Sequence, residues 1–513
     1  MNVVDIGDIT TCRLDLSLGI ITLIQLSPNL EETMQFIPGE TLPIDRRARV
    51  NMPFFDLDLR APTERKCDFG DVVIDFSSER AMREAARCIH CPDPAPCMTA
   101  CPTHNDIPSA MWLIEQGRFN EAANLYHQTS SLPEVCGRVC PHEQLCQGSC
   151  VLNKHQTPVL CGELETFAVD FKRRYEGRII PLAPPSGRRV AIIGAGPAGL
   201  GCADQLLQRG HEVTIFDSKP AAGGLLVYGI PNFKLPKDVW AEKWEEFERA
   251  GVKFVPNTYI GKDKTIDDLF HEGFDAVFIG VGSEIDAKME DTPGTDLPGV
   301  YEATDFLIRG NVGPDLLPED MRNPLEIGRK IAVIGGGDTA SDCLRTALRL
   351  GAEEVTCLYR RTEREMPGGK KDRQMAKDEG AIYRFLTQPI KFIAGEDGKL
   401  AAIECIQMKL GEPDKKGRRK PVPVEGSNFL VECDTAVLAL GYWPDPVIGK
   451  TTPDLETHDW GLISADKATG STSRSGVFSG GDCVTGPDLV VTAMVAGRKA
   501  AWAIDAYLEN LVN

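Results

Sequence analysis

Residues 188–217 read RRVAIIGAGPAGLGCADQLLQRGHEVTIFD. An apolar β run leads into the pattern Gly194-x-Gly196-x-x-Gly199, a helical stretch follows, and a second β run ends at Asp217. The glycines allow a tight turn, close approach of a pyrophosphate and close packing of helix on strand. The helix N-terminus then faces the phosphates, and the acid is placed to bind a ribose hydroxyl. The stretch predicts a dinucleotide-binding α/β domain.

A second copy of the pattern occurs further along, in RKIAVIGGGDTASDCLRTALRLGAEEVTCLYRR. It reads Gly335-x-Gly337-x-x-Ala340, and its second β run ends in Arg360 and Arg361 instead of an acid. An acid would repel a 2′-phosphate, whereas arginines bind one bidentately. The pair therefore predicts NADPH as the second nucleotide. A solvated pair of arginines is the alternative, and with it a preference for NADH stays open.

Two further β runs end in glycine, AVFIGVGS and AVLALGY, and near the C-terminus stands GVFSGGDCVTGPDLVVTAMVAGRKAA. With these features the chain resembles flavoproteins with two dinucleotide-binding domains, in which the NADP domain is inserted in the FAD domain. The resemblance implies that Gly481 and Asp482 bind FAD, with the acid at the ribityl–phosphate region. It also implies a helix from about Val490 whose N-terminus faces the flavin. The segment GGLLVYGIPNFKLP, which contains Gly224, matches the branch with cysteine-rich N-termini, where it packs near the isoalloxazine.

More than half of the 17 cysteines lie between Cys88 and Cys161, in RCIHCPDPAPCMTACP and EVCGRVCPHEQLCQGSCV. Zinc sites usually have two CxxC pairs, and disulfides are rare in a reducing compartment. A Cx2Cx5Cx3CP run is closer to ferredoxins, where a cysteine near in sequence ligates the other cluster. Zinc also carries no electrons, so a redox cluster suits a chain that binds a flavin. We expect iron–sulfur clusters.

The cysteine block closely resembles the N-terminal module of the glutamate synthase small-subunit family. The same module occurs in the large subunit of NADH-dependent ferredoxin:NADP oxidoreductase and at the start of dihydropyrimidine dehydrogenase. The resemblance, from about residue 50 onward, implies two [4Fe–4S] clusters with crossed ligation. By position, the first set of ligands is Cys88, Cys91, Cys97 and Cys150, and the second is Cys101, Cys140, Cys146 and Glu165. Cys161 competes with Glu165 for the eighth place, and Cys136 is expected to be a packed thiol.

Composition and charge limit the partners and the cellular compartment that we expect for the protein. The 513 residues suit several domains, and 42% hydrophobic with 26% charged residues is ordinary for a globular protein. A net charge of −19 argues against nucleic acid or an anionic membrane as partner. The longest apolar candidate, Leu18 to Leu26, is too short to span a membrane. The acidic start does not suit a signal peptide, so we expect a cytoplasmic protein.

These observations predict an α-helical iron–sulfur domain followed by two Rossmann-like α/β domains, the second inserted in the first. The expected parts are an N-terminal extension of unknown role at residues 1–50, which could contribute to a partner interface, the helical domain at 51–180, the FAD domain at 186–300 and 426–513, and the NADP domain at 301–425.

The expected function is that of an electron-input subunit. NADPH delivers a hydride, clusters take single electrons, and a flavin does both, so electrons pass from NADPH through FAD to the clusters. Hydride transfer needs positioning, and we name no catalytic acid or base. No hydrolase motif or substrate barrel is visible, so we expect a hetero-oligomer with a catalytic partner subunit. The first candidate is a glutamate synthase small subunit. Alternatives are the large subunit of a bifurcating transhydrogenase, a dihydropyrimidine dehydrogenase subunit and a non-enzymatic metal-binding scaffold.

Overall fold

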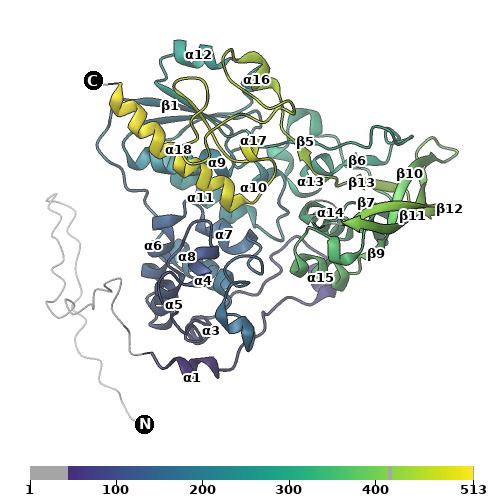
Figure 1. The fold of residues 1–513 in the computed structure, drawn as a ribbon, viewed down its shortest axis with the longest axis horizontal. Coiled ribbons are helices and arrows are strands. Elements are labelled where there is room, and N and C mark those ends of the chain that lie inside the picture. The colour runs from purple at the N-terminus through teal and green to yellow at the C-terminus, as the bar shows by residue number, and fades with distance from the viewer. Residues whose placement is uncertain (1–43, 414–416, 418, 512–513) are drawn as a thin grey trace, which may run out of the picture. The chain divides into compact units, whose positions relative to one another are not determined.

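The computed structural model describes residues 44–413, 417 and 419–511. Most of the predicted N-terminal extension, and with it the hypothesis of an interface there, lies outside these residues. The described residues form an α-helical domain followed by two α/β domains (Figure 1).

The helical domain holds the cysteine block. Its elements are α1 (Arg46–Val50), α2 (Pro62–Arg65), α3 (Ser78–Ala85), α4 (Pro96–Ala100), α5 (Ile107–Glu115), α6 (Phe119–Thr129), α7 (Pro133–Val139), η2 (Val151–Lys154) and α8 (Cys161–Tyr175). The stretch IPSAMWLIEQGRFNEAANLYHQ forms the two helices α5 and α6, because Gly117 takes φ +75° just after α5 and ends it. Buried residues such as Met111, Ile114 and Leu164 form one core between these helices.

The first α/β domain is built on a five-stranded parallel sheet of order β15-β4-β1-β2-β3. Its strands are β1 (Arg189–Ile193), β2 (Glu212–Phe216), β3 (Lys253–Val255), β4 (Ala276–Ile279) and β15 (Val477–Ser479). Its helices are α9 (Pro197–Gln208), α10 (Leu225–Tyr228), α11 (Lys237–Arg249), α12 (Ile266–His271), α16 (Val447–Thr451), α17 (Asp482–Thr485) and α18 (Val490–Asn510). The helix predicted to start near Val490 is thus confirmed as α18.

Two glycines let α9 and α18 lie in backbone contact, side by side in Figure 1. A Cβ atom at Gly497 would stand 1.8 Å from the carbonyl oxygen of Ala198, and one at Gly201 would stand 2.3 Å from that of Met494. Any side chain here would push the helices apart. The C-terminal helix is therefore held directly against the helix that starts at the first glycine motif.

The second α/β domain contains a parallel sheet of order β6-β13-β7-β8-β9 and an antiparallel sheet β10-β11-β12. The strands are β6 (Val300–Glu302), β7 (Lys330–Ile334), β8 (Glu354–Tyr359), β9 (Ile382–Phe385), β10 (Thr387–Ala394), β11 (Leu400–Pro413), β12 (Arg419–Glu432) and β13 (Thr435–Leu438). The helices are α13 (Ala303–Asn311), η3 (Pro314–Leu316), η4 (Glu319–Met321), α14 (Asp338–Arg349), η5 (Glu363–Glu365) and α15 (Lys370–Glu379). The predicted class, two Rossmann-like domains after a helical domain, is confirmed.

Strand pairing shifts the predicted boundaries between the α/β domains. The chain crosses at β5 (Ile285–Asp286) and returns at β14 (Tyr442–Trp443), and these strands pair antiparallel with each other. The predicted borders at 300/301 and 425/426 instead fall at the start of β6 and inside β12. β13, which contains AVL of AVLALGY, pairs with β6 and β7. Both parallel sheets contain short buried strands, so the sequence of β13 alone did not show which sheet it joins.

Among the described helices, none combines the length and apolarity needed to cross a bilayer.

Candidate functional site

The first glycine motif forms a loop between β1 and α9 with open space before it. Gly194 has φ +99°, and a Cβ atom on Gly199 would stand 2.0 Å from the carbonyl oxygen of Gly194. At Gly196 a Cβ atom would meet nothing within 4 Å. The outer two glycines thus serve the turn and the packing, while the middle one leaves room where a pyrophosphate would lie.

Asp217, at the end of β2, is tied to this loop. Its carboxylate accepts hydrogen bonds from the backbone N–H of Ala195 at 2.7 Å and of Lys219 at 2.8 Å. Burial raises the pKa of Asp217, and the two backbone donors oppose that shift. The acid is therefore held in a fixed place beside the glycine loop, as its predicted contact with a ribose requires.

Residues from two distant segments meet the same loop. Gly224 has φ +53°, and a Cβ atom there would stand 2.9 Å from the Cα of Gly196. Gly481 has φ +80°, and its Cβ would stand 2.9 Å from the Cβ of Ala198. Asp482 begins α17 next to it, and burial raises its pKa to about 6. The structure thus brings together all the residues predicted for the first dinucleotide.

The second glycine motif has the same form between β7 and α14. A Cβ atom at Gly335 would stand 2.1 Å from the carbonyl oxygen of Ala439, whereas a Cβ atom at Gly337 would meet no atom within 4 Å. Ala340 is buried in α14. The predicted loop, packing position and free space are therefore present at the second site too.

The two arginines after β8 differ in their surroundings. Arg360 is exposed, and Arg361 is half-buried and donates from Nε to the backbone oxygen of Arg419 at 3.1 Å. Both stand at the carboxyl end of β8, the sheet edge on which the loop after β7 also lies. This is the edge at which dinucleotides bind in such sheets.

The first predicted set of cluster ligands lines one cavity in the helical domain. Its members are Cys88, Cys91, Cys97 and Cys150. Burial raises the pKa of the Cys88 thiol to about 12, so as a free group it would be neutral. A bound cation would be needed to hold thiolates here.

The second predicted set lines a neighbouring cavity. Its members are Cys101, Cys140, Cys146 and Glu165, and Cys136 lies there too. The Oε1 atom of Glu165 is buried and has no hydrogen-bond partner in the described part of the chain. Burial, with Cys136 and Cys146 as the next causes, raises the pKa of this carboxyl well above its usual value. A buried carboxylate oxygen without a partner suits a metal ligand.

Cys161, the alternative eighth ligand, lines both cavities. It begins α8, and Glu165 follows one turn later on the same face of that helix. Every cysteine in the described ranges is a free thiol. Within these ranges no group of three or more His, Cys, Asp or Glu side chains is arranged to hold one metal ion. The fit to a larger group rests on the two cavities, each lined by a complete predicted set.

A larger cavity, of about 510 Å³, lies where the helical domain meets both α/β domains. Its lining includes Cys140 and His142 of the helical domain, Leu489 and Val490 at the start of α18, and Asp338 and Thr339 at the start of α14. These helix starts follow the late motif of the first domain and the glycine motif of the second. One cavity therefore borders the second glycine motif, the start of the helix that follows the late motif of the first domain, and Cys140 of the second cysteine set.

Sequence reasoning missed the ion pairs that frame this cavity. Lys234 contacts Asp342 of α14 at 3.0 Å and Asp372 of α15 at 2.9 Å. Lys371 of α15 contacts Glu163 of α8 at 2.8 Å. Burial would raise the pKa of Glu163, but Lys371 is the leading cause that lowers it, to about 2. Lys234 falls in the segment GGLLVYGIPNFKLP, the only signal in the sequence that pointed here.

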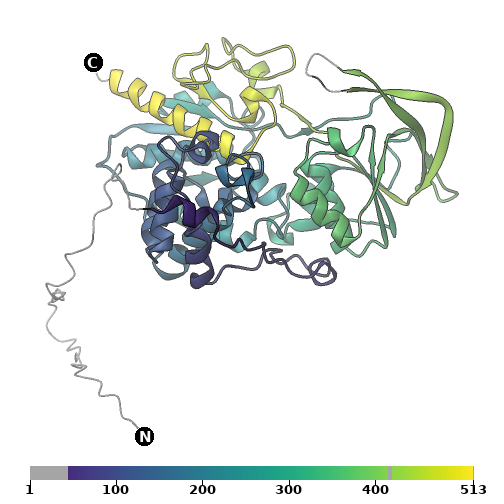
Figure 2. The ribbon, with the colours of Figure 1, turned by 60° about the horizontal axis from the view of Figure 1, so that its bottom comes forward.

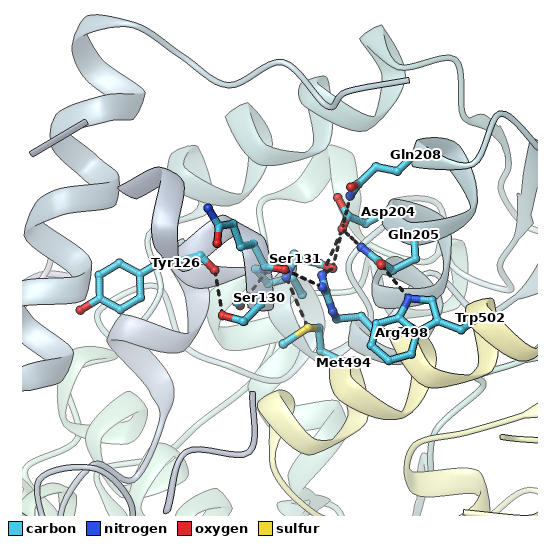
Figure 3. Close-up of polar contacts among 12 residues, drawn as sticks. Tyr126, Ser130, Ser131, Asp204, Gln205, Gln208, Met494, Arg498 and Trp502 are labelled. Carbon is cyan, nitrogen blue, oxygen red and sulfur yellow. Dashed lines mark hydrogen bonds and ion pairs between the residues drawn. The ribbon is translucent and has the colours of Figure 1, made fainter. Parts of the chain in front are cut away.

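A buried polar network joins the helical domain to α9 and α18 (Figure 3). Ser131 donates to Asp204 at 2.7 Å and accepts from Arg498 at 2.9 Å, and Arg498 also donates to the backbone oxygen of Gln128 at 3.0 Å. Arg178 pairs with Asp204 at 3.1 Å. Burial would raise the pKa of Asp204, but Arg178 and the other donors hold it below the usual value. The cysteine cavities are thus fixed against the first α/β domain.

Comparison with known proteins agrees with this architecture. Residues 188–497 match the family model "Pyridine nucleotide-disulphide oxidoreductase", and residues 65–177 match the model "dihydropyrimidine dehydrogenase domain II, 4Fe-4S cluster". The chain is 43% identical over 465 residues to "Putative oxidoreductase AegA" of Escherichia coli K12, covering 88% of this chain and 69% of that one. It is 41% identical over 452 residues to "Glutamate synthase [NADPH] small chain" of the same organism, covering 87% and 95%.

Among solved structures, "Mycobacterium tuberculosis FprA in complex with NADPH" superposes with a TM-score of 0.52 at 21% identity, covering 64% of this chain and 86% of that one. This likeness concerns the fold alone. The predicted resemblance to the glutamate synthase small-subunit family is confirmed by the curated relatives, and so is the expectation of an oxidoreductase with a 4Fe–4S domain and an FAD/NADP-binding domain.

Proposed function

The chain belongs to the pyridine nucleotide-disulphide oxidoreductase family, and we propose that it is the NADPH-oxidising, electron-input subunit of a larger enzyme. The observation that carries the proposal is the cavity of about 510 Å³, which is bordered by the second glycine motif, by the start of α18 after the late motif of the first domain, and by Cys140 of the second cysteine set. A bound flavin accepts two electrons as a hydride and passes them on singly, as clusters require. The chain's task is therefore to bind, orient and shield the carriers around this cavity.

FAD is proposed to bind at the first motif. Gly194, Gly196 and Gly199 leave the space for its pyrophosphate, and Asp217 is anchored at 2.7 Å to the backbone of the same loop. Gly224 and Gly481 approach this loop, and Asp482 stands beside it. The N-terminus of α18 borders the cavity, and its positive end would stabilise negative charge on a reduced flavin.

NADPH is proposed to bind at the second motif, with Gly335, Gly337 and Ala340 forming the loop. Arg360 and Arg361 would hold the 2′-phosphate, since they stand at the sheet edge where the ribose of such a nucleotide lies. No side chain is assigned as a catalytic acid or base, because hydride transfer needs only that the two rings be held in contact.

Two [4Fe–4S] clusters are proposed for the two small cavities. Cys88, Cys91, Cys97 and Cys150 would hold the first, and Cys101, Cys140, Cys146 and Glu165 the second. The unpartnered oxygen of Glu165 supports that residue over Cys161. The second set is the one that also borders the large cavity, through Cys140, so it would receive electrons first.

The partner is proposed to be a subunit that carries the acceptor site, with a glutamate synthase large chain as first candidate. The proposal rests on the relative named "Glutamate synthase [NADPH] small chain", which the chain matches over 95% of its length. The test is to purify the protein anaerobically from its host, record flavin and iron content, and identify what co-purifies.

A chain with a bound flavin and two clusters, reduced by NADPH and joined to a glutaminase-type chain, is the expected result. Co-purification with a small flavin and iron–sulfur chain would replace the partner by one of transhydrogenase type. A colourless zinc protein would refute the function as a whole.

A further inference from the structure

The segment between α1 and α3, residues 53–76, runs from the helical domain to the second α/β domain (Figure 2). We call it the strap. Its two ends are held together by antiparallel bridging of Leu59 with Val73, and Ile74 donates to the backbone oxygen of Asp58 at 2.9 Å. Its tip carries α2, which packs on α15. The strap therefore reaches the domain of the second motif as a closed loop.

A buried ion pair anchors the strap. Arg65 is 1% exposed, and its Nε lies 2.8 Å from Oε1 of Glu379, which is fully buried at the end of α15. Arg65 also donates to the backbone oxygen of Met375 at 3.3 Å. Glu379 is paired as well with Arg345 at 3.0 Å and Arg349 at 2.7 Å, both from α14. The carboxylate of Glu379 is thus paired with arginines from the strap and from α14, two segments that lie far apart in the chain.

An apolar contact beside this pair adds a third segment. Phe69 and Val72 of the strap, Met375 of α15 and Phe233 form a separate small cluster of packed residues. The rings of Phe69 and Phe233 are 6.5 Å apart, and Asn232 donates to the backbone oxygen of Phe69 at 2.7 Å. Phe233 belongs to the segment that starts at Gly224, beside the first dinucleotide loop.

The two elements that the strap contacts, α15 and the segment of Phe233, are each connected to one dinucleotide loop. Just before α15, Gly368 donates to the backbone oxygen of Gly336 at 3.2 Å, and Gly369 donates to the side chain of Asp338 at 2.8 Å. These acceptors lie within the second motif and at the first residue of α14. A shift of α15 therefore shifts the second loop, just as a shift of Phe233 acts on the segment of the first.

We propose that this junction, the clasp, is a positioning device for hydride transfer. The clasp consists of Arg65, Phe69, Val72, Phe233, Met375 and Glu379. It fixes the second dinucleotide loop against the first in the arrangement seen here, and it does so with a strap supplied by the iron–sulfur domain. The inference rests on the proposed function, since it assigns the clasp to the contact between NADPH and flavin.

The need for such a clasp follows from the way the chain connects the two α/β domains, through two short crossings. Within the described ranges, the chain connects the two α/β domains through the crossings at β5 and β14, which form a two-stranded pair. Such a pair is marginal by itself, and domains connected in this way are expected to move relative to each other. Hydride transfer tolerates little misplacement, so contacts outside the crossings must set the distance.

The test compares four variants of the full-length holoprotein. Arg65→Ala removes the anchor while leaving Glu379 its two arginines from α14, so the domain keeps its internal pairing. Phe69→Ala weakens the apolar contact without changing a residue of α15. Arg65→Lys keeps the charge, and Arg329→Ala is the matched control, because it breaks an exposed pair with Glu353 on the same domain.

Two quantities are measured, under anaerobic conditions. The first is the limiting rate of flavin reduction at saturating NADPH, separated from the Kd for NADPH. The second is amide hydrogen exchange of residues 370–379, a readout that does not depend on activity. Arg65→Ala and Phe69→Ala should lower the limiting rate by about tenfold to a hundredfold, with little change in Kd or in the visible spectrum, and should speed exchange in α15. Arg65→Lys should restore part of the rate, and Arg329→Ala should match wild type.

The inference is overturned if both clasp variants keep their cofactors and match wild type in rate and exchange. If Arg65→Ala does not fold, Phe69→Ala decides the question. If NADPH does not reduce the flavin of wild type, the proposed function fails. The exchange of α15 then still tests the clasp. Faster exchange in the variants than in wild type supports the clasp, and unchanged exchange refutes it.

Discussion

Replacing Gly497 by alanine should separate α18 from α9 and release the flavin. The new Cβ would stand 1.8 Å from the carbonyl oxygen of Ala198, whereas real Cβ atoms need about 3.0 Å, so the helices must move apart by about 1.2 Å. The opposing atoms belong to backbone, so no rotamer change relieves the clash. Overpacking typically costs about 1–3 kcal/mol, and a gap of this size forfeits much of the dispersion attraction along the seam. We therefore expect about 3 kcal/mol of destabilisation.

The displaced residue, Ala198, lies within the first glycine motif, so the effect should appear in the flavin. The assay follows the fluorescence of FAD as it leaves the protein on heating. For a domain of this size, about 3 kcal/mol corresponds to a release temperature lower by roughly 6–12 °C. Gly313→Ala is the matched control, because a Cβ there meets nothing within 4 Å and φ is −63°. A Gly497→Ala protein with full FAD and an unchanged release temperature would refute the close helix contact.

Three further changes test the proposed cofactor sites. Removing Arg360 and Arg361 together by alanine should raise the KM for NADPH by about tenfold or more, because charged phosphate contacts are lost, and leave the KM for NADH unchanged; equal effects on both would remove the assignment. Glu165→Ala should lose about half of the iron and acid-labile sulfide while Cys161→Ala keeps both, and the reverse result would make Cys161 the ligand. Burial raises the pKa of Asp482 to about 6, so its ionised form is disfavoured in the folded protein, and the free energy of unfolding should rise as the pH falls through that value; Asp482→Asn should lose this part of the pH dependence, and a dependence that persists would point to another group.

The parts of this protein that could be predicted from sequence are those specified by neighbours in the chain. The turn at Gly194 and the packing at Gly199 are set by residues a few positions away, so the motif specifies strand, loop and helix together. The two cysteine sets were implied by the resemblance to the small-subunit module, whose ligation is crossed. Cys97 and Cys101 are only one turn apart, yet they line different cavities, as that pattern requires.

Features made by distant segments could not be read in this way. Arg65 and Met375 are 310 residues apart, and neither stands in a motif, so nothing in the sequence linked the strap to α15. The sheet of β13, which pairs with β6 and β7, could not be predicted for the same reason, since a run of buried apolar residues does not say which strand it pairs with. Glu163 lies close to Glu165 in sequence, but its role depends on Lys371 of another domain.

The seams around the large cavity differ in chemistry, and the difference bears on what can move. The seam between the helical domain and the first α/β domain contains the ion pair of Arg178, 9% exposed, with Asp204, which is fully buried. Such a seam permits one placement, because sliding would leave a buried charge unpaired at a cost of about 3–5 kcal/mol. On the nucleotide side, Lys371 of the pair with Glu163 is 42% exposed, and an exposed pair is worth only about 0–1 kcal/mol. The helical domain is thus fixed against the first α/β domain, whereas the second α/β domain depends for its position on the clasp and on the pairs of Lys234 with Asp342 and Asp372.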